Sequence, residues 1–347
     1  MKDLSVAIPI YNEEESIPRL CEKLHETLSA LGKSYEIVLV DDGSKDRSWD
    51  VMLEMARKYP NLRLVRFRRN FGQTAAMAAG INESTGAVVV TMDADLQNDP
   101  KDIPAVLAKL DETDDTGRKW DVVSGWRKNR KDAWVSRKLP SMLANKLIGK
   151  MTGVRLHDYG CSLKAYRREI ISQVHLYGEL HRFVPALCRL AGGSVAEIAV
   201  DHHAREFGKS KYGISRTFRV VLDLMLVKFL MSYSTRPIQI FGKLGLWFGF
   251  AATAIFGVVF CEGLCSTLGG APWFGHGETA TILAKRPFWT VTPLMFLGFS
   301  IQLVVLGLLA ELQTRTYHEA QGKQIYSVKE VVESSVPGGA AGTTQGK

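Results

Sequence analysis

The chain has 347 residues and a formal net charge of +8, with 44 Lys and Arg against 36 Asp and Glu. This length allows one large domain or two modest ones, and the positive charge suits an anionic partner such as nucleotide phosphates, nucleic acid or an acidic membrane surface. The five cysteines are scattered, odd in number and free of Cys-x-x-Cys pairs, which argues against a disulfide framework.

From the N-terminus to about residue 200, short apolar runs alternate with amphipathic stretches. Strands are predicted at 5–10, 36–40, 62–67, 87–92, 121–124 and 194–200, and helices at 16–31, 48–59 and 73–85. This alternation predicts an α/β fold with a parallel sheet and helices on both faces. The opening residues are too short for a signal peptide, so we expect this part of the chain in the cytosol. Glycine-rich fingerprints of Rossmann redox enzymes and P-loop NTPases are missing from the sequence.

The pattern changes after residue 213, which we take as the end of the first domain. Residues 214–236 place charged and apolar side chains on opposite helical faces, which predicts an amphipathic juxtamembrane helix. The runs 238–268 and 288–311 are long and apolar enough to predict two membrane spans, joined by an outer loop at 269–287. Basic residues before the first span and after the second favour a cytoplasmic catalytic domain and a cytoplasmic tail at 312–347, whose end is expected to be disordered.

Two acidic motifs follow predicted strands. Asp93 and Asp95, spaced i and i+2, could together address one hard cation such as Mg²⁺ or Mn²⁺, which would bridge a diphosphate. Taken alone, that triplet is more often a turn with a helix N-cap. Asp41 and Asp42 could accept hydrogen bonds from a nucleobase or ribose, or could simply form a turn. Tyr11, at the end of the first strand, could stack on a base.

The order of these motifs resembles that of the family 2 glycosyltransferases. The similar segments are Pro9-Ile10-Tyr11-Asn12-Glu13-Glu14, Val40-Asp41-Asp42-Gly43-Ser44, Arg69-Asn70-Phe71-Gly72-Gln73 and Met92-Asp93-Ala94-Asp95-Leu96-Gln97. Two later segments, 158–168 and 205–212, are similar to the polyprenyl-phosphate branch of that family, which includes dolichyl-phosphate mannose synthases and undecaprenyl-phosphate glucosyl- and aminoarabinosyltransferases. The resemblance extends over about residues 4 to 330.

This resemblance implies a GT-A domain with a mixed, Rossmann-like sheet, followed by amphipathic interface helices and two transmembrane helices. It also implies an inverting transfer of sugar from a nucleoside diphosphate, with UDP favoured, to a polyprenyl phosphate such as undecaprenyl phosphate. The expected cofactor is Mg²⁺ or Mn²⁺. The expected partners are the nucleotide sugar, the lipid acceptor and the cell membrane, with no nucleic acid and with a homotetramer suggested by the family.

The resemblance assigns roles to residues as well. Nucleotide-sugar contacts are expected from Pro9, Tyr11, Glu13, Asp41, Asp42, Asn70 and Asp93. Metal contacts are expected from Asp93, Asp95 and Gln97. Catalytic roles are expected for Asp95, Arg127, Asp158, Arg205 and Lys211. The acceptor phosphate is expected to meet Arg127, Arg137, Ser210 and Lys211.

The chemistry of the acceptor is consistent with a basic site. A phosphate monoester has a second pKa of about 6, so it is largely ionised near pH 7 and needs little general-base assistance. Its requirements are positioning and relief from repulsion by the donor diphosphate, which arginine and lysine provide. Asp158 could be a weak base or could orient a neighbouring cation, and we favour the orienting role.

Two other functions are compatible with parts of the pattern. A processive polysaccharide synthase of the same superfamily is disfavoured because the sequence lacks a Gln-x-x-Arg-Trp element and two spans are too few for a polymer channel. A membrane scaffold that kept the fold without catalysis is disfavoured by the intact Asp93, Asp95, Arg127 and Lys211. Loss of metal-dependent donor binding would favour the scaffold.

Overall fold

The computed structural model describes residues 2–128, 145, 148–150, 152–203, 225, 227, 291, 295, 298, 301, 302, 305, 309, 312, 313, 316 and 325–334. The chain divides into one unit of residues 1–231 and 324–347 and a second unit of residues 232–323. The strands of the first unit are β1 (Leu4–Ile10), β2 (Tyr35–Asp41), β3 (Leu62–Phe67), β4 (Val88–Thr91), β5 (Val122–Trp126), β6 (Lys164–Arg167), β7 (Val195–Ala199) and β8 (Val328–Glu333). Its helices are α1 (Ile17–Ala30), α2 (Ser48–Lys58), α3 (Gln73–Glu83), α4 (Ile103–Asp111), α6 (Arg168–Ile171) and α7 (Val184–Leu190), with 3₁₀ turns at Pro100–Asp102 and Leu180–Arg182.

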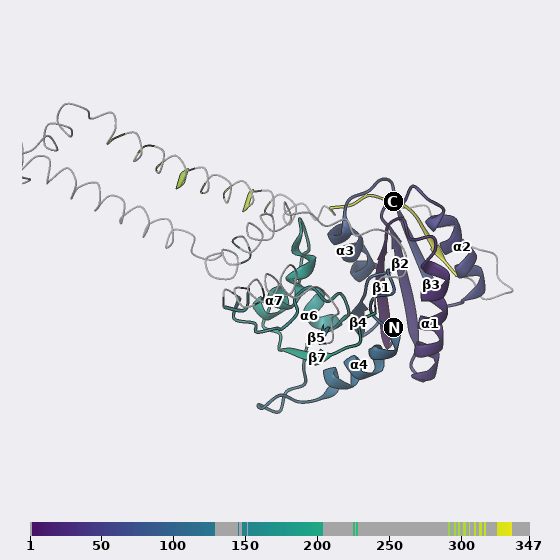
Figure 1. The fold of residues 1–347 in the computed structure, drawn as a ribbon, viewed down its shortest axis with the longest axis horizontal. Coiled ribbons are helices and arrows are strands. Elements are labelled where there is room, and N and C mark those ends of the chain that lie inside the picture. Colours follow the sequence, from purple (N-terminus) through teal and green to yellow (C-terminus); the bar gives the residue numbers. More distant parts are fainter. Residues whose placement is uncertain are drawn as a thin grey trace, which may run out of the picture. The chain divides into compact units, whose positions relative to one another are not determined.

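The strands form one sheet in the order β7-β5-β6-β4-β1-β2-β3-β8 (Figure 1). Strands β1 to β4 are parallel to their neighbours among themselves, and β5 is parallel to β7. Strands β6 and β8 run antiparallel to theirs. The α/β class is confirmed, and so is the mixed sheet that the family resemblance implies. The parallel pairing that the alternation favours is found among β1 to β4, whereas β6 and β8 are antiparallel to their neighbours.

Helices cover both faces of the sheet because the central strands are apolar on both sides. Val6, Ile8 and Ile10 of β1 join one core cluster with buried residues of α1, α2 and α4, whereas Ala7 joins a second cluster with α3, α6 and α7. This assignment follows the two-residue period of a strand. All seven residues of β2 are buried, as expected for a strand with helices on both faces.

Helix α3 lies unusually close to the sheet. Its sequence is rich in alanine, and a Cβ added at Gly80 would come within 3.0 Å of the Ala7 Cβ and 3.5 Å of Val40. Small side chains therefore let the helix axis approach β1 and β2. The start of α3 follows Gly72, so this packing fixes the loop between β3 and α3 against the end of β2.

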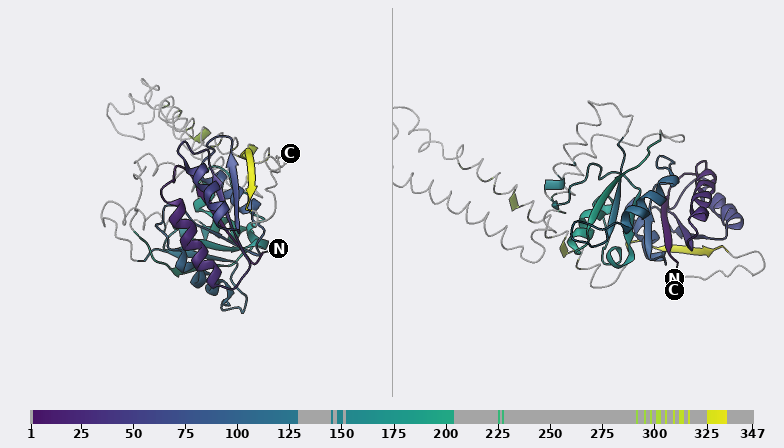
Figure 2. Two further views of the ribbon diagram at one scale, coloured as in Figure 1. Left: turned by 90° about the vertical axis from the view of Figure 1, so that its right-hand side faces the viewer. Right: turned by 90° about the horizontal axis from the view of Figure 1, so that it is seen from below.

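Strand β8 completes the sheet from the far end of the sequence. It pairs with β3 from Arg63 opposite Glu333 to Phe67 opposite Val328, and it is the yellow strand in Figures 1 and 2. The sequence pattern does not predict this strand. Its pairing means that residues 328–333 fold with the N-terminal part of the chain.

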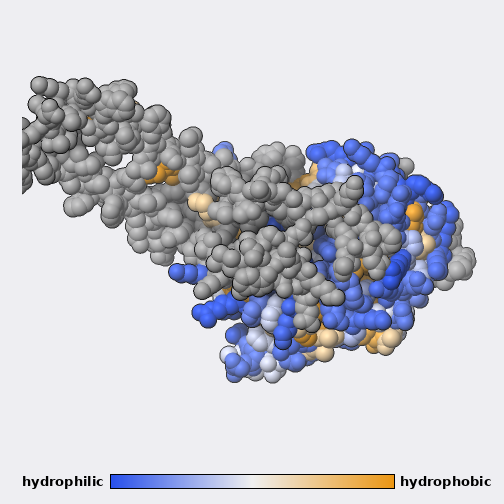
Figure 3. Space-filling view, viewed as in Figure 1, coloured by the Kyte–Doolittle hydropathy of each residue, from blue (hydrophilic) through white to orange (hydrophobic). Residues whose placement is uncertain are grey.

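Several predicted elements fall outside the described residues. They include most of the helix at 214–236, the span at 238–268, the loop at 269–287, much of the span at 288–311 and residues 335–347. Among the residues that the structure describes, no helix is long and apolar enough to cross a membrane. In the view of Figure 3 the described surface of the first unit is mostly hydrophilic, with small apolar patches.

Candidate active site

The predicted polar motifs converge because of the strand directions. Strands β2 and β4 both pair in parallel with β1, so residues that follow these three strands emerge at one edge of the sheet. Strand β5 has the same direction, since it and β4 both run antiparallel to β6. Open α/β sheets bind ligands at such an edge. The structure therefore places the motifs around Tyr11, Asp41, Asp93 and Arg127 along the same edge.

The loops after β1 and β2 are held together by hydrogen bonds. The Asn12 backbone N–H donates to Ser44 Oγ at 3.0 Å, and the Lys45 N–H donates to Asn12 Oδ1 at 2.8 Å. The Glu13 N–H donates to Ser48 Oγ at 2.8 Å. Asn12 has a φ of +55°, a left-handed conformation that asparagine tolerates. This pairing gives the segment around Tyr11 and Glu13 a fixed position.

Asp42 links the end of β2 to the loop before α3. Its carboxylate accepts hydrogen bonds from Asn70 Nδ2 at 2.9 Å, the Phe71 N–H at 2.7 Å and the Gly72 N–H at 3.0 Å. Burial raises the pKa of Asp42 to about 6, although the N–H groups of Phe71 and Gly72 act in the opposite direction. Asn70 and Asp42, both predicted nucleotide contacts, are therefore in direct contact.

Gly43 permits this close approach. Its φ is +66°, and a Cβ built there would lie 2.5 Å from the Arg69 carbonyl carbon and 2.6 Å from the Asn70 nitrogen. No other residue fits this position without moving one of the two loops.

Asp41 lies beside Asp42 but faces a different neighbourhood. Its Oδ1 accepts the Ser44 N–H at 3.0 Å. Its Oδ2 is buried, has no hydrogen-bond partner among the described residues, and lies 3.6 Å from Nε of Arg66. A buried carboxylate needs a compensating partner, so Arg66 is the group that stabilises it here.

Asp93 and Asp95 follow β4 as predicted. Gln73 Nε2 donates to Asp93 Oδ1 at 2.9 Å, and the Gln97 N–H donates to Asp95 Oδ1 at 3.2 Å. Leu96, which lies between Asp95 and Gln97, has a φ of +58°, a strained conformation for a bulky residue, and its side chain is buried. Packing of Leu96 thus supplies the free energy that holds this tight turn and orients the side chains on either side.

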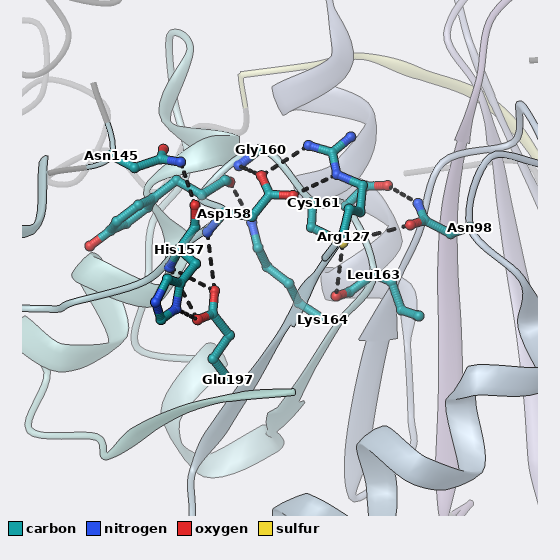
Figure 4. A network of polar contacts seen from close by, with 12 residues as sticks. Asn98, Arg127, Asn145, His157, Asp158, Gly160, Cys161, Leu163, Lys164 and Glu197 are labelled. Carbon is teal, nitrogen blue, oxygen red and sulfur yellow. Dashed lines mark hydrogen bonds and ion pairs between the residues drawn. The ribbon is translucent and has the colours of Figure 1, made fainter. Parts of the chain in front are cut away.

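The pair Arg127 and Asp158 lies next to this turn. Arg127 donates from Nε to Asp158 Oδ2 at 2.6 Å and from Nη2 to Asp158 Oδ1 at 2.9 Å (Figure 4). Burial by itself would lower the pKa of Arg127, but the hydrogen bonds and charge of Asp158 outweigh it and raise the pKa above its ordinary value. Burial raises the pKa of Asp93, and the positive charge of Arg127 offsets part of that rise. The structure thus brings Arg127, Asp158 and Asp93 into one electrostatic group.

Comparisons with known proteins decide the family. The chain is 45% identical over 338 residues to the dodecaprenyl-phosphate galacturonate synthase of Rhizobium johnstonii, covering 95% of this chain and 93% of that protein. Residues 5–174 match the model of glycosyl transferase family 2. The chain belongs to the family 2 glycosyltransferases.

Solved structures agree on the fold of this glycosyltransferase. Glucosyl-3-phosphoglycerate synthase from Mycobacterium tuberculosis, crystallised with Mn²⁺, UDP and phosphoglyceric acid, aligns with a TM-score of 0.51 at 16% identity over 66% of this chain and 78% of that one. Its complex with Mn²⁺, UDP and glucosyl-3-phosphoglycerate aligns with a TM-score of 0.50 at 16% identity, over 66% and 80% of the two chains. At this identity the likeness establishes the GT-A fold.

The acidic turn of the glycosyltransferase suits a divalent cation. Burial raises the pKa of Asp93, and the negative charge of Asp95 raises it further, so the two carboxylates repel each other. A cation bound between them would relieve this repulsion. Within the described ranges, no three His, Cys, Asp or Glu side chains gather around one point. Gln97 and a bound diphosphate could add oxygen ligands to the two carboxylates.

Several residues of the site are not predicted by the sequence. Glu197 of β7 accepts the N–H groups of His157 and Asp158 at 2.9 and 3.1 Å, and its Oε2 contacts His157 Nδ1 at 2.7 Å. His157 in turn stacks on Trp126, with ring centroids 4.3 Å apart. Figure 4 shows Glu197 reaching the backbone that precedes Asp158. This carboxylate fixes the segment that carries Asp158.

Ser162 and Lys164 lie close to the acidic turn and act on Asp93, Ser162 through a hydrogen bond and Lys164 through its charge. Ser162 Oγ accepts from the Asp93 N–H at 3.2 Å and from Asn98 Nδ2 at 2.7 Å. Lys164 is buried and donates to the Tyr159 carbonyl at 3.2 Å, and burial lowers its pKa. Both residues lie in the segment 158–168 that carries the family resemblance, and that resemblance is the sequence signal that could have identified them as site residues. Four predicted residues, Arg137, Arg205, Ser210 and Lys211, lie outside the described residues.

Proposed function

We propose that this glycosyltransferase moves a sugar, with inversion at its anomeric carbon, from a nucleoside diphosphate to a polyprenyl phosphate and releases the nucleoside diphosphate. One observation carries the proposal: 45% identity over nearly the whole chain to a dodecaprenyl-phosphate galacturonate synthase. Galacturonate, linked to UDP, is accordingly the donor sugar that we propose. The acceptor is undecaprenyl phosphate or a polyprenyl phosphate of similar length.

The donor end of the site is proposed to lie over the loops after β1, β2 and β4. Its nucleotide contacts are Pro9, Tyr11, Glu13, Asp41, Asp42, Asn70 and Asp93. The support is that the described contacts tie these loops to one another and leave Asp41 and Asp42 in fixed positions. Rigid loops lower the entropy that binding must overcome.

Asp93, Asp95 and Gln97 would hold Mg²⁺ or Mn²⁺ together with the donor diphosphate. The cation would neutralise charge on the diphosphate as it leaves the sugar. The repulsion between Asp93 and Asp95 supports this assignment because the two carboxylates then share one counter-charge.

The acceptor end is proposed to lie around Arg127. Asp158 occupies two nitrogens of the guanidinium and so fixes its plane, which supports an orienting role for Asp158 over a general-base role. The phosphate of the lipid would meet Arg127 together with Arg137, Arg205, Ser210 and Lys211. Since that phosphate is largely ionised near pH 7, its positioning beside the anomeric carbon is the main requirement.

We also propose that the protein is held in the cell membrane by two spans, 238–268 and 288–311, with the helix at 214–236 at the interface. Residues 203 and 328 belong to the same folded unit, since His203 bonds to Gln97 and β8 pairs with β3. An even number of membrane crossings between them, such as two, is compatible with this. In the second unit, Val291, Met295 and Leu309 are 49%, 55% and 50% exposed, which is unfavourable in water and favourable in lipid. The catalytic domain would then be cytoplasmic, and a homotetramer remains a prediction from the family.

The proposal is tested with purified full-length protein in detergent. Undecaprenyl phosphate would be mixed with a panel of UDP- and GDP-sugars, with Mg²⁺, with Mn²⁺ or with a chelator. We expect transfer from UDP-galacturonate that the chelator abolishes, and much slower transfer from its C4 epimer, UDP-glucuronate. Absence of transfer from every donor would contradict the proposal and favour the scaffold function.

A further inference from the structure

We propose that Arg66 and the C-terminal strand β8 position the carboxylates that hold the donor nucleotide, so that residues beyond the predicted membrane spans tune donor binding. This inference rests on the proposed function, because it takes Asp41 and Asp42 as nucleotide contacts. It assigns Arg66 and Glu330 as positioning residues, since both act through Asp41 and neither is proposed to touch the donor.

Arg66 is the centre of the arrangement. It lies on β3, and its Nη1 is 3.4 Å from Glu330 Oε1 of β8, while its Nε is 3.6 Å from Asp41 Oδ2 of β2. Its guanidinium carbon lies 4.9 Å from the centroid of the Trp49 ring in α2. Arg66 and Glu330 are 264 residues apart in sequence. One side chain thus joins the C-terminal strand to the end of the strand that carries the predicted nucleotide contacts.

Asp41 depends on this arginine. The residue is fully buried, its Oδ1 is occupied by the Ser44 N–H, and its Oδ2 has no hydrogen bond within the described part of the chain. Transfer of an ionised carboxylate into such a place is costly without a nearby opposite charge. Any shift of the Arg66 guanidinium therefore changes both the orientation of Asp41 and the turn to Ser44.

A second set of contacts leads from the same end of the chain to Asp42. Tyr326 stacks on Phe67 with ring centroids 5.0 Å apart, and Phe67 packs edge-to-face on Phe71 at 5.6 Å. The Phe71 N–H is one of the donors to Asp42 Oδ1. The Arg68 N–H also donates to the Ser327 carbonyl at 3.1 Å. The segment 326–330 thus supports both carboxylates, through Arg66 on one side and through two phenylalanines on the other.

The same strand provides a matched control. Glu333 forms an ion pair with Arg63 at 2.8 Å, also between β8 and β3, and the other described acidic partner of Arg63 is Glu83. Glu333 is 69% exposed, so its pair contributes little to stability. Glu330→Gln and Glu333→Gln therefore remove the same charge from the same strand, and only the first acts on the arginine beside Asp41.

The test measures UDP binding to the full-length protein in detergent with Mn²⁺, by titration calorimetry. We expect Arg66→Met to weaken UDP binding by about tenfold or more, because it leaves the Asp41 charge uncompensated, and Arg66→Lys to restore part of the loss. Glu330→Gln should weaken it by about threefold, and Glu333→Gln by less than about twofold. The KM for the lipid acceptor should stay unchanged in all four variants.

Equal UDP affinities for Glu330→Gln and Glu333→Gln would overturn the inference, and so would an equal rise in the KM values for donor and acceptor. Melting temperatures of these two variants control for a general loss of the sheet edge. Asp41→Asn separates this inference from the function beneath it. If that variant binds UDP as the wild type does, the nucleotide role of Asp41 is wrong, and the inference falls with it. If it binds UDP weakly while Glu330→Gln does not, only the inference is wrong.

Discussion

Arg127 and Asp158 face each other in a two-point ion pair, with side chains only 12% and 9% exposed. Asp158 also accepts the Gly160 N–H at 3.0 Å, so its carboxylate is fixed to its own loop as well as to the arginine. The Arg127 guanidinium, held this firmly, suits the binding of a phosphate whose position decides the rate of transfer.

Asp158→Asn should therefore reduce kcat by about a hundredfold or more, because an amide cannot accept from both guanidinium nitrogens and the arginine turns away. The variant should also lose roughly 3 kcal/mol of stability, since the buried arginine keeps its charge without a partner. Steady-state kinetics and chemical denaturation measure the two effects.

Asp111→Asn is the matched control for that variant. Asp111 pairs with Arg167 at 3.1 Å. Arg167 lies opposite Val88, the first residue of β4, so this ion pair is at the end of the strand opposite to the one that carries Asp93. Asp111 is 52% exposed, so we expect a stability change below about 1 kcal/mol and an unchanged kcat. Equal kinetic losses in both variants would contradict the role given to Asp158.

Glu197→Gln should lower kcat/KM for the lipid acceptor by about tenfold while UDP affinity stays within about twofold. The physical reason is that Glu197 accepts from the N–H groups of His157 and Asp158 and pairs with His157 Nδ1, so its loss loosens the segment that carries Asp158. Parallel measurements of acceptor kinetics and UDP binding separate the two ends of the site. A loss of UDP affinity as large as the kinetic loss would contradict this assignment.

Gly43→Ala should destabilise the protein by at least about 2 kcal/mol, because a left-handed φ and a clash with Arg69 act together. Gly32→Ala isolates the first effect. Gly32 has a similar φ of +62°, but an added Cβ meets no atom of the described residues within 4 Å. That control should cost only about 1 kcal/mol. Denaturant unfolding compares the pair, and similar losses would show that the loops after β2 and β3 are not tightly apposed.

The stability of the nucleotide-free protein should depend on pH through Asp42. Burial raises the pKa of this carboxyl from 3.8 to about 6, so the folded state holds its proton more tightly than the unfolded state does. The stabilisation from Asp42 is complete below pH 3.8 and is lost as pH rises through about 6, by an amount on the order of 3 kcal/mol.

Asp42→Asn should remove this dependence. The difference in free energy of unfolding between wild type and variant should therefore shift in favour of the variant between pH 4 and pH 7, whatever its value at either end. Denaturant titrations at several pH values measure it. Parallel pH profiles for the two proteins would contradict the raised pKa of Asp42.

Much of the first domain could be predicted because its signals are local. The strand at 62–67 was predicted with the bounds that the structure has, and buried apolar runs mark β1 and β2 almost as clearly. The acidic motifs at Asp42 and Asp93 were predicted at strand ends for the same reason. The direction of each strand then brings them together without further information.

The rest of the fold depends on contacts that are distant in sequence. Strand β6 has only four residues, Lys164 to Arg167, and β8 is a charged edge strand with the sequence VKEVVE, so neither has a long apolar run. Charges are common on edge strands because they prevent unwanted pairing. The pairing of β8 with β3 therefore required the structure.

The site residues also divide into those with a sequence signal and those that depend on contacts distant in sequence. Asp158 and Arg127 were predicted through the family resemblance, whereas Glu197 was not, because a single glutamate in a strand carries no local signal. It is 39 residues from Asp158, whose N–H it accepts. Arg66 was missed for the same reason, since its role depends on Glu330 and on the burial of Asp41.

The most direct test of the central claim is to identify both products of one reaction. Purified protein would be incubated with UDP-galacturonate, Mn²⁺ and undecaprenyl phosphate, followed by intact mass of the lipid and chromatography of the nucleotide. We predict a lipid carrying one hexuronate on a single phosphate, with one UDP released per product and no reaction in Asp95→Ala. Release of UMP with a lipid diphosphate sugar, or hydrolysis of the donor without a lipid product, would contradict transfer of the sugar to the lipid phosphate.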